Sequence, residues 1–250
     1  MHNTLRIATF NIHKGFTYFN ASFSLHLQRE MLRKLQANVI FLQEMQDRHT
    51  QHTERFVSWP TSGQMAFLAD EVWSDYRYGK NSVYPADHHG NALLSKFPIT
   101  ASHKQDISAH DSERRGMLHC EINIPNWDQP LHAICLRLGL FAKWQRQQLL
   151  AVATYIEQYV AANAPLIIAG DFNDWGMRAG RGFAECLGLH ELFEHHTGKS
   201  ARNFPAWLPI LRLDRIYARG FNVKHVAVHA GPQFLKLSDH VILTASLTKI

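Results

Sequence analysis

Apolar and polar residues alternate or cluster along this chain in a way that predicts many short strands. Leu5–Ile12 alternates as a half-buried strand does, and Val39–Leu42 is short and fully apolar, as expected for a strand buried on both faces. Turn-forming residues separate the later apolar runs. The same reasoning predicts strands over Asn91–Ser95, Ile99–Ile107, Gly116–Ile124, Leu131–Leu138, Leu166–Ala169, Leu213–Tyr217, Asn222–His229 and Val241–Leu247.

Helical spacing of apolar residues occurs in both halves of the chain. Ser24 is a candidate N-cap for a helix that would carry Leu27, Met31, Leu32 and Leu35 on one face. A long helix is predicted from Ala142 to Val160, with its apolar stripe at Leu149, Val152, Ala153, Ile156 and Tyr159. Shorter helices are predicted over Met65–Trp73, with Phe67, Leu68, Val72 and Trp73 inward, and over Phe183–Leu187.

This order of elements favours stacked β-sheets covered by helices over a simple alternation of strand and helix. The chain shows no internal repeat, low-complexity tract or linker, so residues 1–250 are expected to form one domain. The hydrophobic fraction of 46% is enough for a sizeable core, while the charged fraction of 19% excludes a disordered chain. The pattern alone does not decide between architectures.

Composition also bears on location and partners. No apolar run approaches the roughly 18 residues of a membrane helix, and the three cysteines, Cys120, Cys135 and Cys186, have no C-x-x-C spacing. We therefore expect buried free thiols in a cytoplasmic, reducing compartment. The net charge of +5 suits an anionic partner such as nucleic acid, a phospholipid head group or a sugar phosphate.

Polar residues follow several predicted strands at the point where each strand ends. Such positions can converge on one edge of a sheet, where carboxylate and amide oxygens could hold Mg²⁺ and a carboxylate or histidine could transfer a proton. Each position alone has a structural interpretation as well, such as a turn, a surface ion pair or a strand cap. The residues concerned are Asn11, Glu44, Asp171, Asn173, Asp214, Asp239 and His240.

Six ordered segments resemble the motif set of the endonuclease/exonuclease/phosphatase superfamily, across about residues 5–247. This resemblance implies a four-layer α/β/β/α sandwich of two packed mixed β-sheets flanked by helices, with the site at one edge. It also implies a Mg²⁺-dependent hydrolase acting on phosphoric ester bonds, with Mn²⁺ as a substitute. The segments are Thr9-Phe-Asn-Ile-His13, Leu42-Gln-Glu44, His89-Gly-Asn-Ala-Leu-Leu-Ser95, Gly170-Asp-Phe-Asn173, Leu213-Asp-Arg-Ile-Tyr217 and Ser238-Asp-His240.

The resemblance also implies a role for each matching residue. Glu44 would be the principal metal ligand, with Asn11 and Asp239 close to the metal. Asp171 would orient or deprotonate the attacking water, and Asn173 would donate to a phosphoryl oxygen. The remaining expectations are that His240 contacts the phosphate, that Asp214 holds His240 by a hydrogen bond, and that Arg115 and Asn91 bind substrate.

One position departs from the family pattern. Where many members have a His-Leu-Gly run after the central strand, this chain reads Cys135-Leu-Arg-Leu-Gly139, so Arg137 takes the place of a second catalytic histidine. Arginine stays charged and cannot act as a general acid near neutral pH, but it can hold a phosphate. Because Arg137 has the strand parity of Ala133 and Cys135, we expect its side chain to point into the site rather than to pair at the surface.

The substrate is not specified by these motifs, because the family acts on DNA, RNA, phospholipids and inositol phosphates with nearly the same core. We expect a monomeric phosphodiester hydrolase acting on nucleic acid, with a phospholipid or inositol-phosphate phosphodiesterase or phosphatase as the alternative. A third possibility is a phosphate-ligand binding protein without catalytic activity, which only Arg137 supports.

Overall fold

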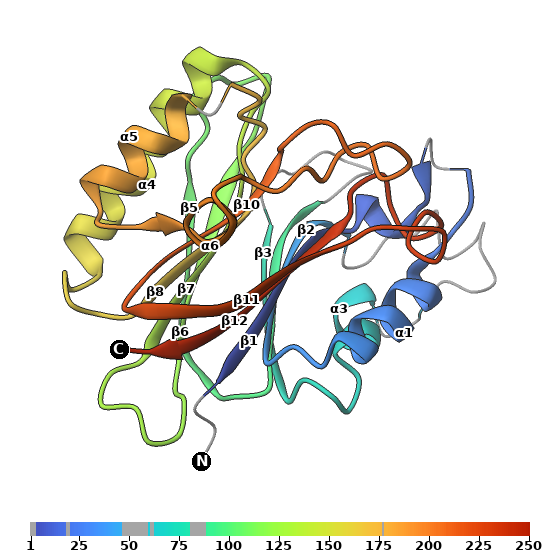
Figure 1. Ribbon diagram of the computed structural model, residues 1–250, viewed down its shortest axis with the longest axis horizontal. Coiled ribbons are helices and arrows are strands. Elements are labelled where there is room, and N and C mark those ends of the chain that lie inside the picture. The colour runs from blue at the N-terminus through green and yellow to red at the C-terminus, as the bar shows by residue number, and fades with distance from the viewer. Residues whose placement is uncertain (1–3, 19–20, 47–59, 61–62, 81–88, 177) are drawn as a thin grey trace.

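Two six-stranded β-sheets pack face to face, and helices cover both outer faces, as Figure 1 shows. The structure is a computed structural model that describes residues 4–18, 21–46, 60, 63–80, 89–176 and 178–250. Each sheet contains one parallel pair among antiparallel neighbours, β1 with β2 in the first and β7 with β8 in the second. The predicted α/β/β/α sandwich of two mixed sheets is therefore confirmed.

The first sheet joins the two ends of the chain. Its strand order is β11 (Phe221–His229), β12 (Ile242–Lys249), β1 (Leu5–Asn11), β2 (Val39–Met45), β4 (Gly90–Ser95) and β3 (Asp75–Lys80). The second sheet comes mostly from the middle of the chain. Its order is β5 (Ile99–Asp106), β6 (Gly116–Ile122), β7 (Leu131–Arg137), β8 (Leu166–Asp171), β10 (Asp214–Arg219) and β9 (His190–Glu191).

Strand alternation divides the buried side chains into three layers. Side chains such as Ile7, Phe41 and Cys135 fill the space between the sheets, while their strand neighbours point outward. The outer face of the first sheet packs against α1 (Leu25–Leu35) and α3 (Gln64–Ala69). The outer face of the second packs against α4 (Ala142–Tyr159) and α5 (Arg178–Cys186), and a short helix, α6 (Leu192–Thr197), follows β9.

The predicted inward faces of two helices need correction. In α1 the buried residues are Leu25, Gln28 and Leu32, while Leu27 is 48% exposed. Gln28 is buried because its amide donates to the carbonyls of Ile12 and Leu237, which an apolar side chain could not do. Tyr159, at the last turn of α4, is 57% exposed. Both errors, at Leu27 and at Tyr159, arise because the spacing of apolar residues carries no information on polar partners or on where a packing surface ends.

Other differences concern element ends and elements that the sequence did not predict, among them the strands β3 and β9 and the helix α6. The helix predicted over Met65–Trp73 ends at Ala69, and Trp73 is nonetheless buried, with its indole N–H donated to Ala37. Strand β3 is largely polar, so its sequence shows no strand pattern, but β4 supplies its hydrogen-bonding partner. Ser24 is the N-cap residue of α1 as predicted, but its side chain accepts no hydrogen bond from the helix, because its hydroxyl donates to main-chain carbonyls instead.

Strands β1, β2, β7 and β8 of the two sheets end at one common edge, away from both chain termini (Figure 1). Cys120 and Cys135 are buried and free as expected, whereas Cys186 is exposed, contrary to expectation, because α5 ends at the surface there. Among the helices of the described residues, none is both long and apolar enough to cross a bilayer.

Candidate active site

Asn11 joins the two sheets at the common edge. It is the last residue of β1, and its side-chain amide donates to Glu44 Oε1 at 3.1 Å and to Asp171 Oδ2 at 3.3 Å. Asp171 ends β8 in the opposite sheet, so one buried amide holds carboxylates from both sheets together. The amide oxygen of Asn11 accepts from the main-chain N–H of His13, which fixes the orientation of the amide.

The chain at Glu44 adopts a conformation that few side chains tolerate. Its φ is +57°, and it lies within an irregularity of the β2–β4 pairing between Leu42 and Met45. A bulge re-aims a side chain that regular alternation would direct elsewhere. Non-glycine residues in this region are uncommon and persist where the surrounding structure holds them. Asn173, with φ of +49°, repeats this feature, and its N–H donates to Asp171 Oδ1 at 3.1 Å.

Arg137 points into the site, as its strand parity indicates. Its Nη2 lies 2.8 Å from Glu44 Oε1, and its Nε lies 3.5 Å from Asp171 Oδ2. Burial alone would raise the pKa of Glu44, but the charge of Arg137 and the hydrogen bond from Asn11 outweigh it and lower that pKa to about 2. Glu44 is therefore an ionised carboxylate at neutral pH although it is largely enclosed by protein.

Asp214 and His240 form a buried pair, with Asp214 Oδ2 and His240 Nδ1 2.7 Å apart, so the predicted hydrogen bond is present. Burial disfavours a charged imidazole, but the Asp214 charge and hydrogen bond dominate and raise the pKa of His240 to about 10. Asn203 holds the main chain of Asp214 in place, because its side-chain oxygen accepts from the Asp214 N–H and its amide nitrogen donates to the Asp214 C=O. His240 therefore carries a proton at neutral pH, with its Nε2 directed away from Asp214.

Asp239 lies beside this pair and close to the end of β1. Ser238 Oγ is 2.8 Å from the carbonyl oxygen of Asn11 and 3.2 Å from Asp239 Oδ1. The Nδ1 atom of His13 lies 3.6 Å from the same carboxylate oxygen. The C-terminal motif is thus tied to the N-terminal one, which brings Asp239 to the same edge as Asn11 and Glu44.

Asn91 and Arg115 lie near the site, but their described contacts are with main chain and with one acid. The Asn91 amide reaches across the sheets to the carbonyls of Gly116 at 2.7 Å and Cys135 at 3.3 Å. Arg115 donates to the Leu138 carbonyl and pairs with Glu113 at 2.9 Å. These contacts give both residues a structural role. Their expected role in binding substrate stays a prediction.

Sequence reasoning missed three residues that hold the site together. Gln145, near the start of α4, donates from one amide to the carbonyls of Gly139 and Asn173. Asn203 lies in a loop between α6 and β10, far from any recognised motif. His13 belongs to a recognised segment, but nothing in the chain alone places it against Asp239. No local signal marks Gln145 or Asn203, because their partners are distant in sequence.

The residues expected to hold a metal have the chemistry of a Mg²⁺ site. Glu44 is ionised, and within the described part of the chain Asn11 and Arg137 both contact its Oε1, which leaves Oε2 open to a further ligand. Asp239 adds a second carboxylate and Asn11 an amide oxygen. Hard oxygen donors of this kind match Mg²⁺ and do not favour softer ions.

A groove of about 430 Å³ opens beside Asn173. It is lined by Leu140, Arg146 and Trp175 among others, so a cation and exposed apolar groups border the polar site. Trp175 is 62% exposed, and Trp207 is 61% exposed one residue after Ala206, whose N–H donates to the carbonyl of Asp239. Two solvent-facing indole rings therefore belong to segments that contact the site, Trp175 in the groove lining and Trp207 next to Ala206.

Known proteins resemble this chain both in sequence and in fold. The model of the Endonuclease/Exonuclease/phosphatase family matches residues 8–240. The Escherichia coli K12 protein YbhP, described as uncharacterized, is 38% identical over 244 residues, which cover 98% of this chain and 96% of YbhP.

Two solved structures share the fold at low sequence identity. An endonuclease/exonuclease/phosphatase from Beutenbergia cavernae has a TM-score of 0.78 at 18% identity, covering 99% of this chain and 72% of its own. The human Nocturnin catalytic domain with a bound sulfate anion has a TM-score of 0.76 at 17% identity, covering 100% and 96%. With the family model matched over nearly the whole length, this chain belongs to the endonuclease/exonuclease/phosphatase family, whose members hydrolyse phosphoester bonds.

Proposed function

We propose that this protein is a Mg²⁺-dependent phosphodiester hydrolase. Its active site is the group of side chains at the common edge of the two sheets, called the edge site below: Asn11, Glu44, Arg137, Asp171, Asn173, Asp214, Asp239 and His240. The observation that carries the proposal is that Asn11 bonds carboxylates of both sheets, Glu44 and Asp171, beside the Asp214–His240 pair. Nocturnin, which has the same fold, binds a sulfate anion, and sulfate has the shape and oxygen arrangement of a phosphate. That similarity supports a phosphate ligand for this chain.

Glu44, Asn11 and Asp239 would hold Mg²⁺, with Mn²⁺ as a substitute. The bound ion would neutralise phosphate charge and stabilise the leaving oxygen. These three residues provide oxygen donors, which is the chemistry that such an ion requires.

Asp171 is the residue best placed to act on water. Its Oδ1 accepts from the N–H of Asn173 and its Oδ2 from Asn11, which orients the carboxylate without neutralising it. A positioned carboxylate can orient a water molecule and accept its proton as the oxygen attacks phosphorus. The proton would pass from the water oxygen to Asp171, and the leaving oxygen would depart on the opposite side of phosphorus.

Two further side chains would stabilise the charge that develops on the phosphoryl oxygens. Asn173 uses one amide hydrogen on the Leu138 carbonyl at 3.1 Å, so its second hydrogen is available to a substrate. His240 would donate from Nε2, while Asp214 keeps Nδ1 engaged and the imidazole protonated. Preorganised donors of this kind need no reorientation as charge builds up.

Arg137 replaces a proton donor with a permanent cation. It pairs with Glu44, whose pKa it lowers, and it places a positive charge 3.5 Å from Asp171. It cannot protonate a leaving group. We therefore expect this enzyme to favour phosphodiesters with good leaving groups.

Nucleic acid is the proposed substrate, and the protein is proposed to act on it as a monomer. The exposed ring of Trp175 at the groove could stack on bases, which accept such contacts without sequence preference, and the exposed ring of Trp207, next in the chain to Ala206, could do the same. The net charge of +5 favours a polyanion. A phospholipid head group or an inositol phosphate is the second candidate. Support for this candidate comes from exposed apolar side chains, namely Leu140 in the groove lining, its neighbour Phe141, and Leu208 and Ile210 in the segment after Trp207.

A substrate panel tests both levels of the proposal. Wild type and Asp171→Ala are incubated with bis-nitrophenyl phosphate, plasmid DNA, single-stranded RNA, sphingomyelin, cardiolipin and inositol phosphates, with Mg²⁺ or EDTA. We expect Mg²⁺-dependent nitrophenol release and a loss of about 10²–10⁴-fold in the variant. Nucleic acid should be cut fastest among the natural substrates. Tight binding without turnover by wild type would support the non-catalytic alternative instead.

A further inference from the structure

A second group of metal-ligating side chains lies on the outer face of the second sheet, beneath α4. His119 and Glu121 are two residues apart on β6, so they share a face, and Glu121 is directly paired with His132 on β7. The neighbours of these residues along the strands, Leu118, Cys120 and Ala133, point to the opposite face, into the space between the sheets. The register of β6 on β7 therefore brings the three polar side chains together.

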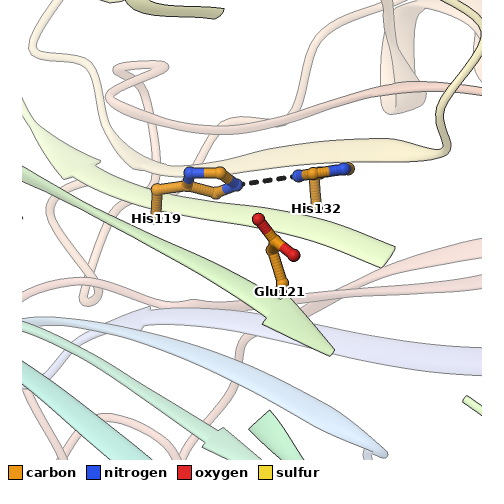
Figure 2. A group of neighbouring side chains, drawn as sticks. All are labelled: His119, Glu121 and His132. Atoms are coloured by element: carbon orange, nitrogen blue, oxygen red, sulfur yellow. Dashed lines mark hydrogen bonds between the residues drawn. The ribbon is translucent and has the colours of Figure 1, made fainter. Parts of the chain in front are cut away.

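The ligand atoms of this group are close enough for one ion. One nitrogen or oxygen of each side chain lies within 4.8 Å of the other two. His119 Nε2 and His132 Nδ1 are 2.9 Å apart, and Figure 2 shows the Glu121 carboxylate pointing toward the space between the two rings. Around tetrahedral Zn²⁺, with bonds of about 2.0–2.1 Å, neighbouring nitrogens lie roughly 3.3 Å apart. A small separation of the two rings would admit the ion.

The hydrogen bonds of His119 place its Nε2 atom on the side where the metal would lie. Its Nδ1 lies 3.1 Å from the hydroxyl of Tyr155 on α4. A ligating histidine commonly donates its other N–H to such a partner, which fixes the ring and its tautomer. With Nδ1 protonated toward Tyr155, Nε2 presents its lone pair toward His132 and Glu121.

Both imidazoles are held in the form that binds metal. Burial, with the neighbouring His132 and His103, lowers the pKa of His119 to about 3. Burial also lowers the pKa of His132. Neutral imidazole is the ligand form of histidine, so no proton has to be displaced from a charged ring near neutral pH. His132 would only shift its proton from Nδ1 to Nε2 through exchange with solvent.

We propose that His119, Glu121 and His132 form a second divalent-metal site, suited to Zn²⁺ and separate from the edge site. Two imidazoles and one carboxylate leave a fourth position for water or another ligand. Imidazole donors favour Zn²⁺ over Mg²⁺, so the two sites differ in the ion they select. Arg137 lies five positions after His132 on β7, so these two residues of the two sites are roughly 17 Å apart along the strand at about 3.3 Å per residue. An ion at this site would link β6 to β7 beneath α4.

Metal binding by the full-length protein tests this site directly. Metal-free protein, kept in excess Mg²⁺ to fill the edge site, is titrated with Zn²⁺ against a chromophoric chelator and with Co²⁺ by visible absorption. We expect one Zn²⁺ per chain and a Co²⁺ spectrum of low coordination number. The variants His119→Gln, Glu121→Gln and His132→Gln should each weaken Zn²⁺ binding at least tenfold, and Zn²⁺ should raise the Tm of wild type more than that of any of these three variants.

Two matched variants separate this site from other sources of binding. His103→Gln removes an exposed imidazole whose ring centre is 5.9 Å from that of His119, and it should leave Zn²⁺ affinity unchanged. Glu44→Gln alters the edge site and should likewise leave it unchanged. Glu121 is only partly buried, so Glu121→Gln is the informative variant if a histidine change prevents folding. Absence of Zn²⁺ binding by wild type, or loss of binding in Glu44→Gln but not in Glu121→Gln, would overturn the proposal.

Discussion

Glu44, in the edge site, is ionised at neutral pH although protein encloses it. His119, on the outer face of the second sheet, is also buried but is neutral at the same pH. Burial opposes the charged form of both groups. At the edge site, Arg137 lies 2.8 Å from Glu44 and more than offsets that cost. Around His119 the closest partners are a neutral ring and a phenol, so the cost is not offset.

This difference shows what each cluster can do. A site with fixed charges of both signs can bind and polarise an anionic substrate, but it depends on every charged partner being present. A site of neutral imidazoles has no such dependence and offers lone pairs to a softer cation. The predictions below remove one member of a cluster at a time, and each is matched with a change elsewhere in the molecule.

Loss of Arg137 should have the largest effect. Arg137→Gln leaves Glu44 and Asp171 enclosed without their shared cation, so we expect a destabilisation of about 3–5 kcal/mol. Urea unfolding in EDTA measures it. Arg114→Gln removes a surface arginine that pairs with Asp106 and Asp111 and should cost at most about 1 kcal/mol. Equal unfolding midpoints for the two variants would show that Arg137 does not hold the edge site together.

Asn173→Ala should lower kcat by about 10²–10³-fold, because it removes a donor to the phosphoryl oxygens. Asn126→Ala is the matched control, since Asn126 lies in the turn between β6 and β7 and has the same left-handed backbone, with φ of +68° against +49°. Both variants carry the backbone cost of alanine in that region, but only Asn173 lies at the site. Steady-state kinetics with bis-nitrophenyl phosphate distinguish them. Similar kcat values would remove Asn173 from the mechanism.

Asp214→Asn and Glu121→Gln make the same chemical change beside a histidine, one in each cluster. Asp214→Asn should lower kcat by about 10–100-fold, as expected for loss of a partner that orients a functional histidine. Without the carboxylate that raises it, the pKa of His240 should fall, so activity should decline at a lower pH than in wild type as His240 loses its proton. Glu121→Gln should leave both kcat and the pH profile unchanged. A wild-type profile for Asp214→Asn would contradict the assigned role.

The smallest effect concerns His119 and the pH dependence of stability. Its folded pKa of about 3 lies below the ordinary 6.5, so the unfolded state binds more protons between these values, and stability falls as pH drops below 6.5. At pH 5 this amounts to about 2 kcal/mol. In EDTA, His119→Gln should therefore lose less stability than wild type between pH 7 and pH 5. Parallel curves for the two proteins would show that His119 is not held neutral.

The resemblance of six short segments was enough to predict the architecture. Strand alternation placed Arg137 correctly because parity along β7 is a local property that one packed face suffices to set. The buried asparagine, carboxylates and histidine of the edge site lie in segments with recognisable local form. The polar strand β3 was missed because an edge strand needs little apolar pattern of its own.

By itself, the sequence determined most of the stretches that become strands and helices, the family that the chain resembles and the side chains that are candidates for the chemistry. The tertiary structure alone decided which of those side chains meet. Asn11 and Asp171 are 160 positions apart, and His119 meets His132 only through the register of β6 on β7. Asn203 and Gln145 reach the site through loops and a helix that no local pattern connects to it. Such contacts depend on pairing and packing between distant segments, and local periodicity does not encode that information.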